Sequence, residues 1–209
     1  MEQIAPNKKF PSFEEEGISR KMVICGDHLL KYLGSDGLES LVAHNSDTVR
    51  GFAVFGLSKH LHDASIKQVL AMVRQFAADS HFGVREWAWL AVRPRLVEEL
   101  PESISALTSW TSEADVNIRR FAVEALRPRG VWCKHIAELR NHPELGLPLL
   151  EPMRAEPEKY AQDSVANWLN DASKDHAKWV HDLCKRWCEA DPSSASTKRI
   201  STRAQRSIS

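Results

Sequence analysis

Residues 118–123 read IRRFAV, and the same phrase occurs twice earlier, as VRGFAV from residue 49 and VREWAW from residue 84. The three copies therefore begin 35 and then 34 residues apart. Each copy follows a polar turn and places apolar residues three and four positions apart, which is the spacing of one helix face. Weaker copies follow at 161–166 and 197–200. A period of this length predicts a fold built from repeated helices.

The stretches between the copies have the pattern of partner helices. Residues 65–77 (SIKQVLAMVRQFA) place apolar side chains on one face, and residues 101–112 (PESISALTSWTS) form a second such stretch. Because one amphipathic helix cannot bury its apolar stripe alone, stacked pairs bury it against their neighbours. The sequence predicts an all-α, HEAT-like helical repeat solenoid, with residues 1–209 as one domain. We expect residues 1–16 to be flexible and residues 192–209 to form a basic C-terminal helix or tail.

Composition and charge limit the class of protein. Hydrophobic residues make up 43% of the 209 residues and charged residues 27%, as in ordinary globular proteins. No apolar run approaches the ~20 residues that cross a bilayer, and the polar N-terminal stretch lacks the apolar core of a secretory signal. We expect a cytoplasmic, monomeric protein with no membrane partner. The net charge is zero, which disfavours a general nucleic-acid binder, but basic residues gather in 118–140 and 192–209, consistent with one basic face.

The arginine in second position of each strong copy has two interpretations. Arg50, Arg85 and Arg119 are either solvated or salt-bridged at each repeat, or they line one face and follow the phosphates of a duplex. The sequence alone leaves both open.

The sequence contains no motif for a metal site, a phosphate-binding loop or a serine-hydrolase active site. Cys184 and Cys188 share a helix face, but only His181 lies near them, whereas a zinc site needs about four ligands. We therefore expect these cysteines to be buried, and we expect no metal and no cofactor. No glycine-rich phosphate loop, Walker lysine motif or GxSxG elbow occurs.

Three segments resemble a known family. Residues 164–176 read SVANWLNDASKDH, residues 118–132 read IRRFAVEALRPRGVW and include RPRGVW, and residues 84–94 form the third segment. These are similar to the motifs SVANHLNDISKDHP and RPRLPW of the AlkC-type branch of the AlkC/AlkD superfamily, the alkylpurine DNA glycosylases. The resemblance covers about residues 45–209. We do not expect any segment here to form the immunoglobulin-like domain that some members carry.

The resemblance implies a HEAT-like solenoid that wraps double-stranded DNA and hydrolyses the N-glycosidic bond of N3- and N7-alkylated purines, as part of base excision repair. A cationic purine is already a good leaving group, so such an enzyme needs carboxylates that stabilise the sugar cation and place a water. An aromatic ring can hold the cationic base.

The matched motifs assign roles to particular residues. Asp171 and Glu124 fall on acidic active-site positions, and Trp132 falls on the position that contacts the lesion. A third carboxylate position holds Trp89, a second lesion-contacting candidate, and Glu86 one helical turn earlier is the candidate substitute. The structural alternatives are that the tryptophans belong to the core and that Asp171 caps a helix beginning near Ser173.

The basic residues near these motifs and in the repeats are the candidate DNA contacts: Arg50, Arg85, Arg119, Arg120, Arg127, Arg129, Lys174, Lys198 and Arg199. The chain departs from the family at Gln162 and Asp163, where arginines are expected, and at Trp168, where histidine is usual. Gln162 and Asp163 predict lost phosphate contacts and an added repulsive charge. Two alternatives to an enzyme therefore stay open, namely a catalytically inactive HEAT-repeat DNA-binding module and a helical protein-interaction scaffold.

Overall fold

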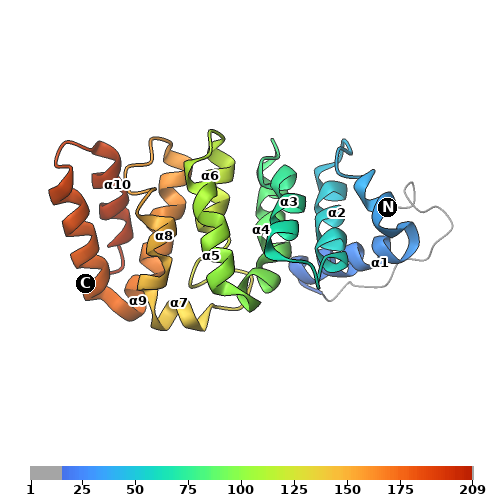
Figure 1. Ribbon diagram of the computed structural model, residues 1–209, viewed down its shortest axis with the longest axis horizontal. Coiled ribbons are helices and arrows are strands. Elements are labelled where there is room, and N and C mark those ends of the chain that lie inside the picture. Colours follow the sequence, from blue (N-terminus) through green and yellow to red (C-terminus); the bar gives the residue numbers. More distant parts are fainter. Residues whose placement is uncertain (1–15, 209) are drawn as a thin grey trace. The chain divides into compact units, whose positions relative to one another are not determined.

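A computed structural model describes residues 16–208, and these residues form helices with no β-strand among them (Figure 1). The helices are α1 (Ile18–Glu39), α2 (Asp47–His60), α3 (Ile66–Ala77), α4 (Phe82–Glu98), α5 (Leu100–Thr108), η1 (Ser109–Ser112), α6 (Val116–Glu124), α7 (Ala137–Asn141), η2 (Pro143–Gly146), α8 (Leu147–Leu150), α9 (Lys159–Ala190) and α10 (Ala195–Ala204). The predicted all-α class is confirmed. Of residues 1–16, which are predicted to be flexible, all except Glu16 lie outside the described residues.

The chain divides into two compact units, Met1–Arg95 and Leu96–Ser209, with the boundary near the end of α4. The prediction of one repeat domain over the whole chain stays a prediction. None of the helices within residues 16–208 combines the length and the apolar character that crossing a bilayer requires.

The first unit is built on a close approach between α1 and α2. A Cβ placed on Gly26 would lie 2.7 Å from the backbone nitrogen of Gly56, so the two helices touch where both lack side chains. The predicted helix at 65–77 is confirmed as α3. Ser65 caps it by accepting a hydrogen bond from the backbone of Gln68, whose side chain in turn accepts one from the Ser65 backbone.

In the second unit, α9 packs against both α6 and α10 (Figure 1). The predicted helix at 101–112 is present as α5 and η1, and α6 ends at Glu124, before Pro128. α4, in contrast, includes Pro94 and ends only at Glu98. α9 bends at His176, whose φ of −135° and ψ of 55° are not helical. The helical alternative for the C-terminal segment holds over Ala195–Ala204.

The recurring arginines close the turn that precedes their own helix. Arg50, Arg85 and Arg119 each donate from Nη1 to the backbone carbonyls six and five positions earlier, at 2.7–3.3 Å. Gln162 does the same with its amide Nε2, at 2.7 and 3.2 Å. The same bond pattern in four turns fixes how the chain enters α2, α4, α6 and α9.

Two of these arginines also bind an acid of the next turn along the chain. Arg50 donates to both carboxylate oxygens of Asp79 at 2.7 and 2.9 Å, and Arg119 donates to both of Glu156 at 2.8 and 2.7 Å. The pKa of Arg50 and that of Arg119 are raised, chiefly by these hydrogen bonds. The salt-bridged interpretation is therefore confirmed for Arg50 and Arg119. Contact of these two side chains with phosphate stays a prediction.

Candidate active site

Arg127 joins the two acidic residues that the motifs singled out. Its Nη1 donates to Glu124 at 2.8 Å, while its Nε and Nη2 donate to Oδ2 of Asp171 at 2.9 and 2.8 Å. Glu124 is the last residue of α6, and Asp171 lies in the first part of α9, so the two packed helices bring the acids together. We call Glu124, Arg127 and Asp171 the acid cluster.

Glu124 is almost entirely enclosed, with 4% of its surface exposed. Its Oε2 accepts a hydrogen bond from Ser164 at 2.6 Å and lies 3.7 Å from the guanidinium of Arg120. Burial by itself would raise the pKa of Glu124, but the charges of Arg127 and Arg120, with the hydrogen bonds, outweigh it and lower the pKa. Glu124 is therefore an ionised, fully hydrogen-bonded carboxylate.

Asp171 is also 4% exposed and lies well inside α9. The alternative that it caps a helix beginning near Ser173 is therefore wrong, because α9 runs unbroken from Lys159 past this position. Its two oxygens differ in their surroundings. Oδ2 accepts both bonds from Arg127, whereas Oδ1 lies 3.3 Å from the ammonium of Lys174, a side chain that is 45% exposed.

Trp132 lies in the loop that connects α6 to α7, and its indole is 57% exposed. Its neighbour Val131 is 71% exposed. The backbone NH of Ile136 donates to the carbonyl of Pro128 at 2.9 Å and closes the base of the loop. The alternative that this tryptophan belongs to the core is therefore wrong, and its ring is open to a ligand.

Glu86 and Trp89 form a pair in the first unit. The indole Nε1 donates to a Glu86 oxygen at 3.0 Å, which confirms that the two side chains share a face of α4. Only 4% of Trp89 is exposed, so the core alternative describes this residue better than contact with a lesion. A catalytic role for Glu86 stays a prediction.

The other candidate DNA contacts already have intramolecular roles. Arg120 is buried with its guanidinium 4.6 Å from the ring centre of Tyr160, and Arg129 donates to Asp175 at 2.7 Å. Arg199 donates to Gln162 and Asp163. Lys198, in contrast, is exposed. Phosphate contact stays a prediction for each of these side chains.

The departures from the family motif serve the fold. Asp163 accepts a hydrogen bond from Arg199 at 2.7 Å and forms an ion pair with Nε of Arg203 at 2.9 Å. The expectation that Asp163 adds a repulsive charge is therefore corrected, because two arginines of α10 balance the charge of this acid. Trp168 is fully buried and donates to the carbonyl of Leu126 at 2.9 Å. A Cβ on Gly146 would overlap its ring, so this glycine makes room for the indole.

Several residues of the site could not be identified from the motifs. Ser164 donates to Glu124, and Arg203 pairs with Asp163. Arg140 donates to Asp175. The motifs gave none of these four residues a role. Arg199, Arg203 and Arg206 are four and three positions apart, a spacing that does predict one helix face.

No group of three or more His, Cys, Asp or Glu side chains within residues 16–208 is placed to hold a metal ion. Cys184 is buried as expected, which raises the pKa of its thiol to about 11, whereas Cys188 is only partly buried, contrary to the expectation.

The chain was compared with known proteins by sequence and by structure. No protein-family model matches the sequence. The uncharacterised protein YhaZ of Bacillus subtilis is 36% identical over 102 residues, which are 49% of this chain and only 29% of YhaZ. Among solved structures, AlkD2 from Streptococcus mutans has a TM-score of 0.75 at 20% identity and covers 99% of this chain and 98% of its own.

Two further structures are similar. The alkylpurine DNA glycosylase AlkC of Pseudomonas fluorescens, bound to DNA containing an abasic site analogue, has a TM-score of 0.63 at 22% identity. The match covers 99% of this chain and 59% of AlkC. The protein smu.31 from Streptococcus mutans UA159 has a TM-score of 0.73 at 20% identity, over 91% and 92% of the two chains. At these identities the chain has the helical fold of AlkC and AlkD2.

Proposed function

We propose that this chain is a DNA alkylation repair glycosylase of the AlkC/AlkD superfamily, which hydrolyses the N-glycosidic bond of cationic N3- or N7-alkylated purines in duplex DNA. One observation carries the proposal. Two of the segments that resemble AlkC motifs, residues 118–132 and 164–176, each supply one acid to the acid cluster, and Arg127 joins the two acids. The loop beside the cluster carries the exposed indole of Trp132.

In the proposed mechanism, positive charge develops on the sugar and Asp171 is the acid that stabilises it. The bond from C1′ to the purine nitrogen breaks with its electron pair passing to the base, which neutralises the base and leaves an oxocarbenium-like sugar. Arg127 fixes Oδ2 of Asp171 with two hydrogen bonds, so Oδ1 is the oxygen left to face the sugar. A water adds to C1′ and gives its proton to Asp171.

Lys174 and Glu124 have supporting parts in this mechanism. Lys174 contacts Oδ1 from a half-exposed position, and it moves to a DNA phosphate when the duplex binds. Glu124 does not touch the sugar. It holds Arg127 from the opposite side and so orients Asp171, which makes it a positioning residue. The Trp132 ring lies against the cationic base.

A DNA-binding module without catalysis is the second candidate, and the charges of the site favour it. The two acids of the cluster lie among the three cations Arg120, Arg127 and Lys174, so their negative charge is more than balanced. A carboxylate so neutralised stabilises a sugar cation less than a lone one does.

Base release separates the two candidates. The protein is incubated with duplex DNA that carries 7-methylguanine or 3-methyladenine, and the released base is measured. We expect release by the wild-type chain, and a loss of at least about 100-fold in Asp171→Asn, the order of effect that a charge-stabilising group has. Asp182→Asn, which removes an exposed acid from the same helix, is the matched control.

Binding without release by the wild-type chain would support the module instead. A protein-interaction scaffold is the remaining alternative, and a salt titration tests it. Absence of DNA affinity at low salt, where phosphate contacts are strongest, would contradict both DNA-based functions.

A further inference from the structure

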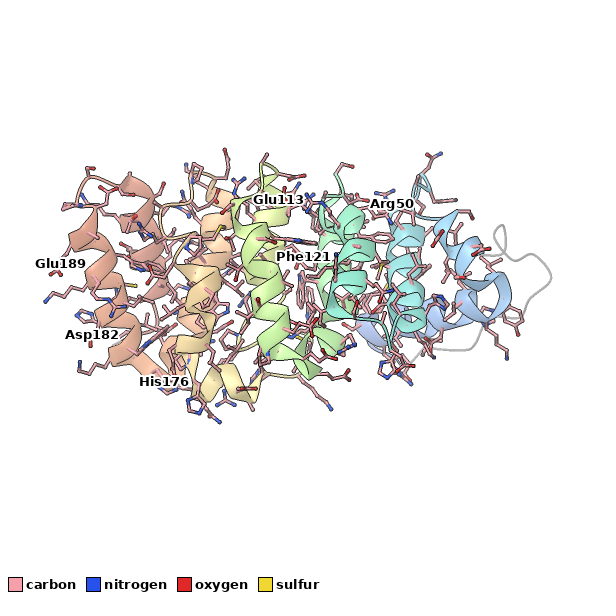
Figure 2. The ribbon with its side chains drawn as sticks, in the orientation of Figure 1. Arg50, Glu113, Phe121, His176, Asp182 and Glu189 are labelled. Atoms are coloured by element: carbon pink, nitrogen blue, oxygen red, sulfur yellow. The ribbon has the colours of Figure 1, made fainter. Side chains whose placement is uncertain are left out.

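The bend of α9 carries a second, separate group of charges. Asp175 is the last residue before the bend at His176 inside α9, which Figure 2 labels at the bottom of the view. Arg129 donates from Nη2 to both oxygens of Asp175 at 2.7 Å. Arg140 donates from Nε and Nη2 at 3.0 and 3.1 Å, in the two-bond geometry that fixes both partners. We call Asp175, Arg129 and Arg140 the loop clamp.

The loop clamp encloses the segment that carries Trp132. Arg129 stands three residues before the tryptophan and Arg140 eight residues after it, on α7. The imidazole of His176 also contacts α7. Its Nε2 lies 2.7 Å from the Arg140 carbonyl oxygen, and because this oxygen can only accept, Nε2 is the donor. With the Pro128–Ile136 backbone bond, both ends of the loop are therefore anchored to the bend of α9.

Val131 and Trp132 are both more than half exposed, so burial contributes little to their position. The clamp charges are themselves partly exposed, and exposed ion pairs contribute little to overall stability. Hydrogen bonds from Arg140 and Arg129 lower the pKa of Asp175, so the acid stays ionised and the clamp stays closed at neutral pH.

We propose that Asp175 is a positioning residue, which through Arg129 and Arg140 holds the loop so that the Trp132 indole is already in place for the damaged base. This inference rests on the proposed glycosylase function. Ordering a contact group before binding removes an entropy cost from the reaction, and small misplacements of such groups cost large factors in rate.

A double-mutant cycle tests whether Asp175 acts through Trp132. Base release is measured under single-turnover conditions for wild type, Asp175→Asn, Trp132→Ala and the double variant. We expect Asp175→Asn to lower the rate constant about tenfold, within the range that loss of orientation produces. In the Trp132→Ala background the same substitution should change the rate less than about twofold, since the group that it positions is gone.

Three further measurements separate positioning from a general loss of structure. Asp175→Glu keeps the charge and should recover part of the rate, while the control Asp182→Asn should release base at the wild-type rate. Affinity for undamaged duplex should not fall in Asp175→Asn, because the substitution removes no cation. Hydrogen exchange of the backbone amides between 129 and 136 should become faster in Asp175→Asn and remain unchanged in Asp182→Asn.

The possible failures are distinguishable. No release by the wild-type chain would overturn the proposed function and the positioning role with it. Wild-type release with an unaffected Asp175→Asn variant would overturn the positioning role alone. So would an equal loss in both backgrounds, or amide exchange in the loop that the substitution does not change.

Discussion

Arg119 donates two hydrogen bonds to Glu156, which lies 37 positions further along the chain. The same guanidinium donates to the carbonyls of Glu113 and Ala114, so one side chain fixes its own turn and ties it to the next. Glu156 is buried, and the backbone NH of Glu158 also donates to it. Removal of the arginine would leave a buried carboxylate without its cation.

Arg119→Ala should therefore lower the free energy of unfolding by about 3 kcal/mol, the cost of breaking a buried pair from one side. Arg119→Gln should cost less, because Gln162 makes the corresponding turn bonds with an amide. Urea denaturation at neutral pH measures both variants. Equal losses in the two variants would contradict a separate contribution from the turn bonds.

Gly26→Ala should destabilise the first unit by about 1–3 kcal/mol through overpacking, because the new methyl group meets the backbone of Gly56. Gly17→Ala is the control, since a Cβ there has no atom within 4 Å apart from those of its own chain neighbours. Thermal unfolding followed by circular dichroism compares the two. A stable Gly26→Ala variant would show that α1 and α2 can move apart without cost.

Gly146 and Trp168 should be energetically coupled. Gly146→Ala forces a methyl group into the indole and should cost about 1–3 kcal/mol in the wild-type background. With Trp168→His, which restores the residue usual in the family motif, the same change should cost much less. Denaturation of the single and double variants gives the coupling energy, and strictly additive losses would contradict the contact.

Stability should fall on acidification partly because of Glu124. Its pKa is lower in the folded chain than in the unfolded chain, so its contribution is fully present above the unfolded pKa of about 4.3 and is lost as the pH falls through the folded pKa. Glu124→Gln should therefore flatten the decline in unfolding free energy between about pH 5 and pH 3. Denaturant titrations across this range measure the slope, and an unchanged slope would show that Glu124 does not contribute.

Lys198 and Arg50 should differ in DNA binding. Lys198 is exposed, so Lys198→Ala should reduce the slope of log affinity against log salt by about 0.9, the value for one phosphate contact. Arg50 already uses Nε, Nη1 and Nη2 within the protein, so Arg50→Gln should leave the slope unchanged. Fluorescence anisotropy with undamaged duplex at several salt concentrations measures both. A smaller slope in Arg50→Gln would instead support the prediction from the sequence that Arg50 contacts phosphate.

Local patterns of the sequence predicted the helices well. The repeated phrase marks the beginnings of α2, α4 and α6, and the apolar spacing of residues 65–77 is that of α3, because helix formation depends on neighbours three and four positions away. The partners of the repeated arginines were not predicted. Asp79 and Glu156 lie 29 and 37 positions after Arg50 and Arg119, so packing decides these pairs. One signal was available, since both acids stand six positions before Arg85 and Gln162, the next residues of the series.

The site, too, has residues that the motifs identified and residues that only tertiary packing brings to it. Motif similarity named Glu124 and Asp171, and the structure brings both to Arg127. It did not give the role of Asp175, because the partners of that acid lie 46 and 35 positions earlier, on opposite sides of a loop. Nor could it give the burial of Trp89 and the exposure of Trp132, since that difference depends on tertiary packing: Trp89 lies inside α4, whereas Trp132 lies in the loop after α6.

Asp171 and Asp175 are four residues apart on the same stretch of α9, which is about 6 Å along a helix axis. The acid at the proposed reaction centre and the acid that anchors the indole loop therefore share one rigid support, and neither can shift along it without the other. A loop of different length, grafted between α6 and α7 with its anchoring arginines kept, would change the reach of its tip while the reaction centre stayed where it is. Lesion preference could then be engineered in that loop alone.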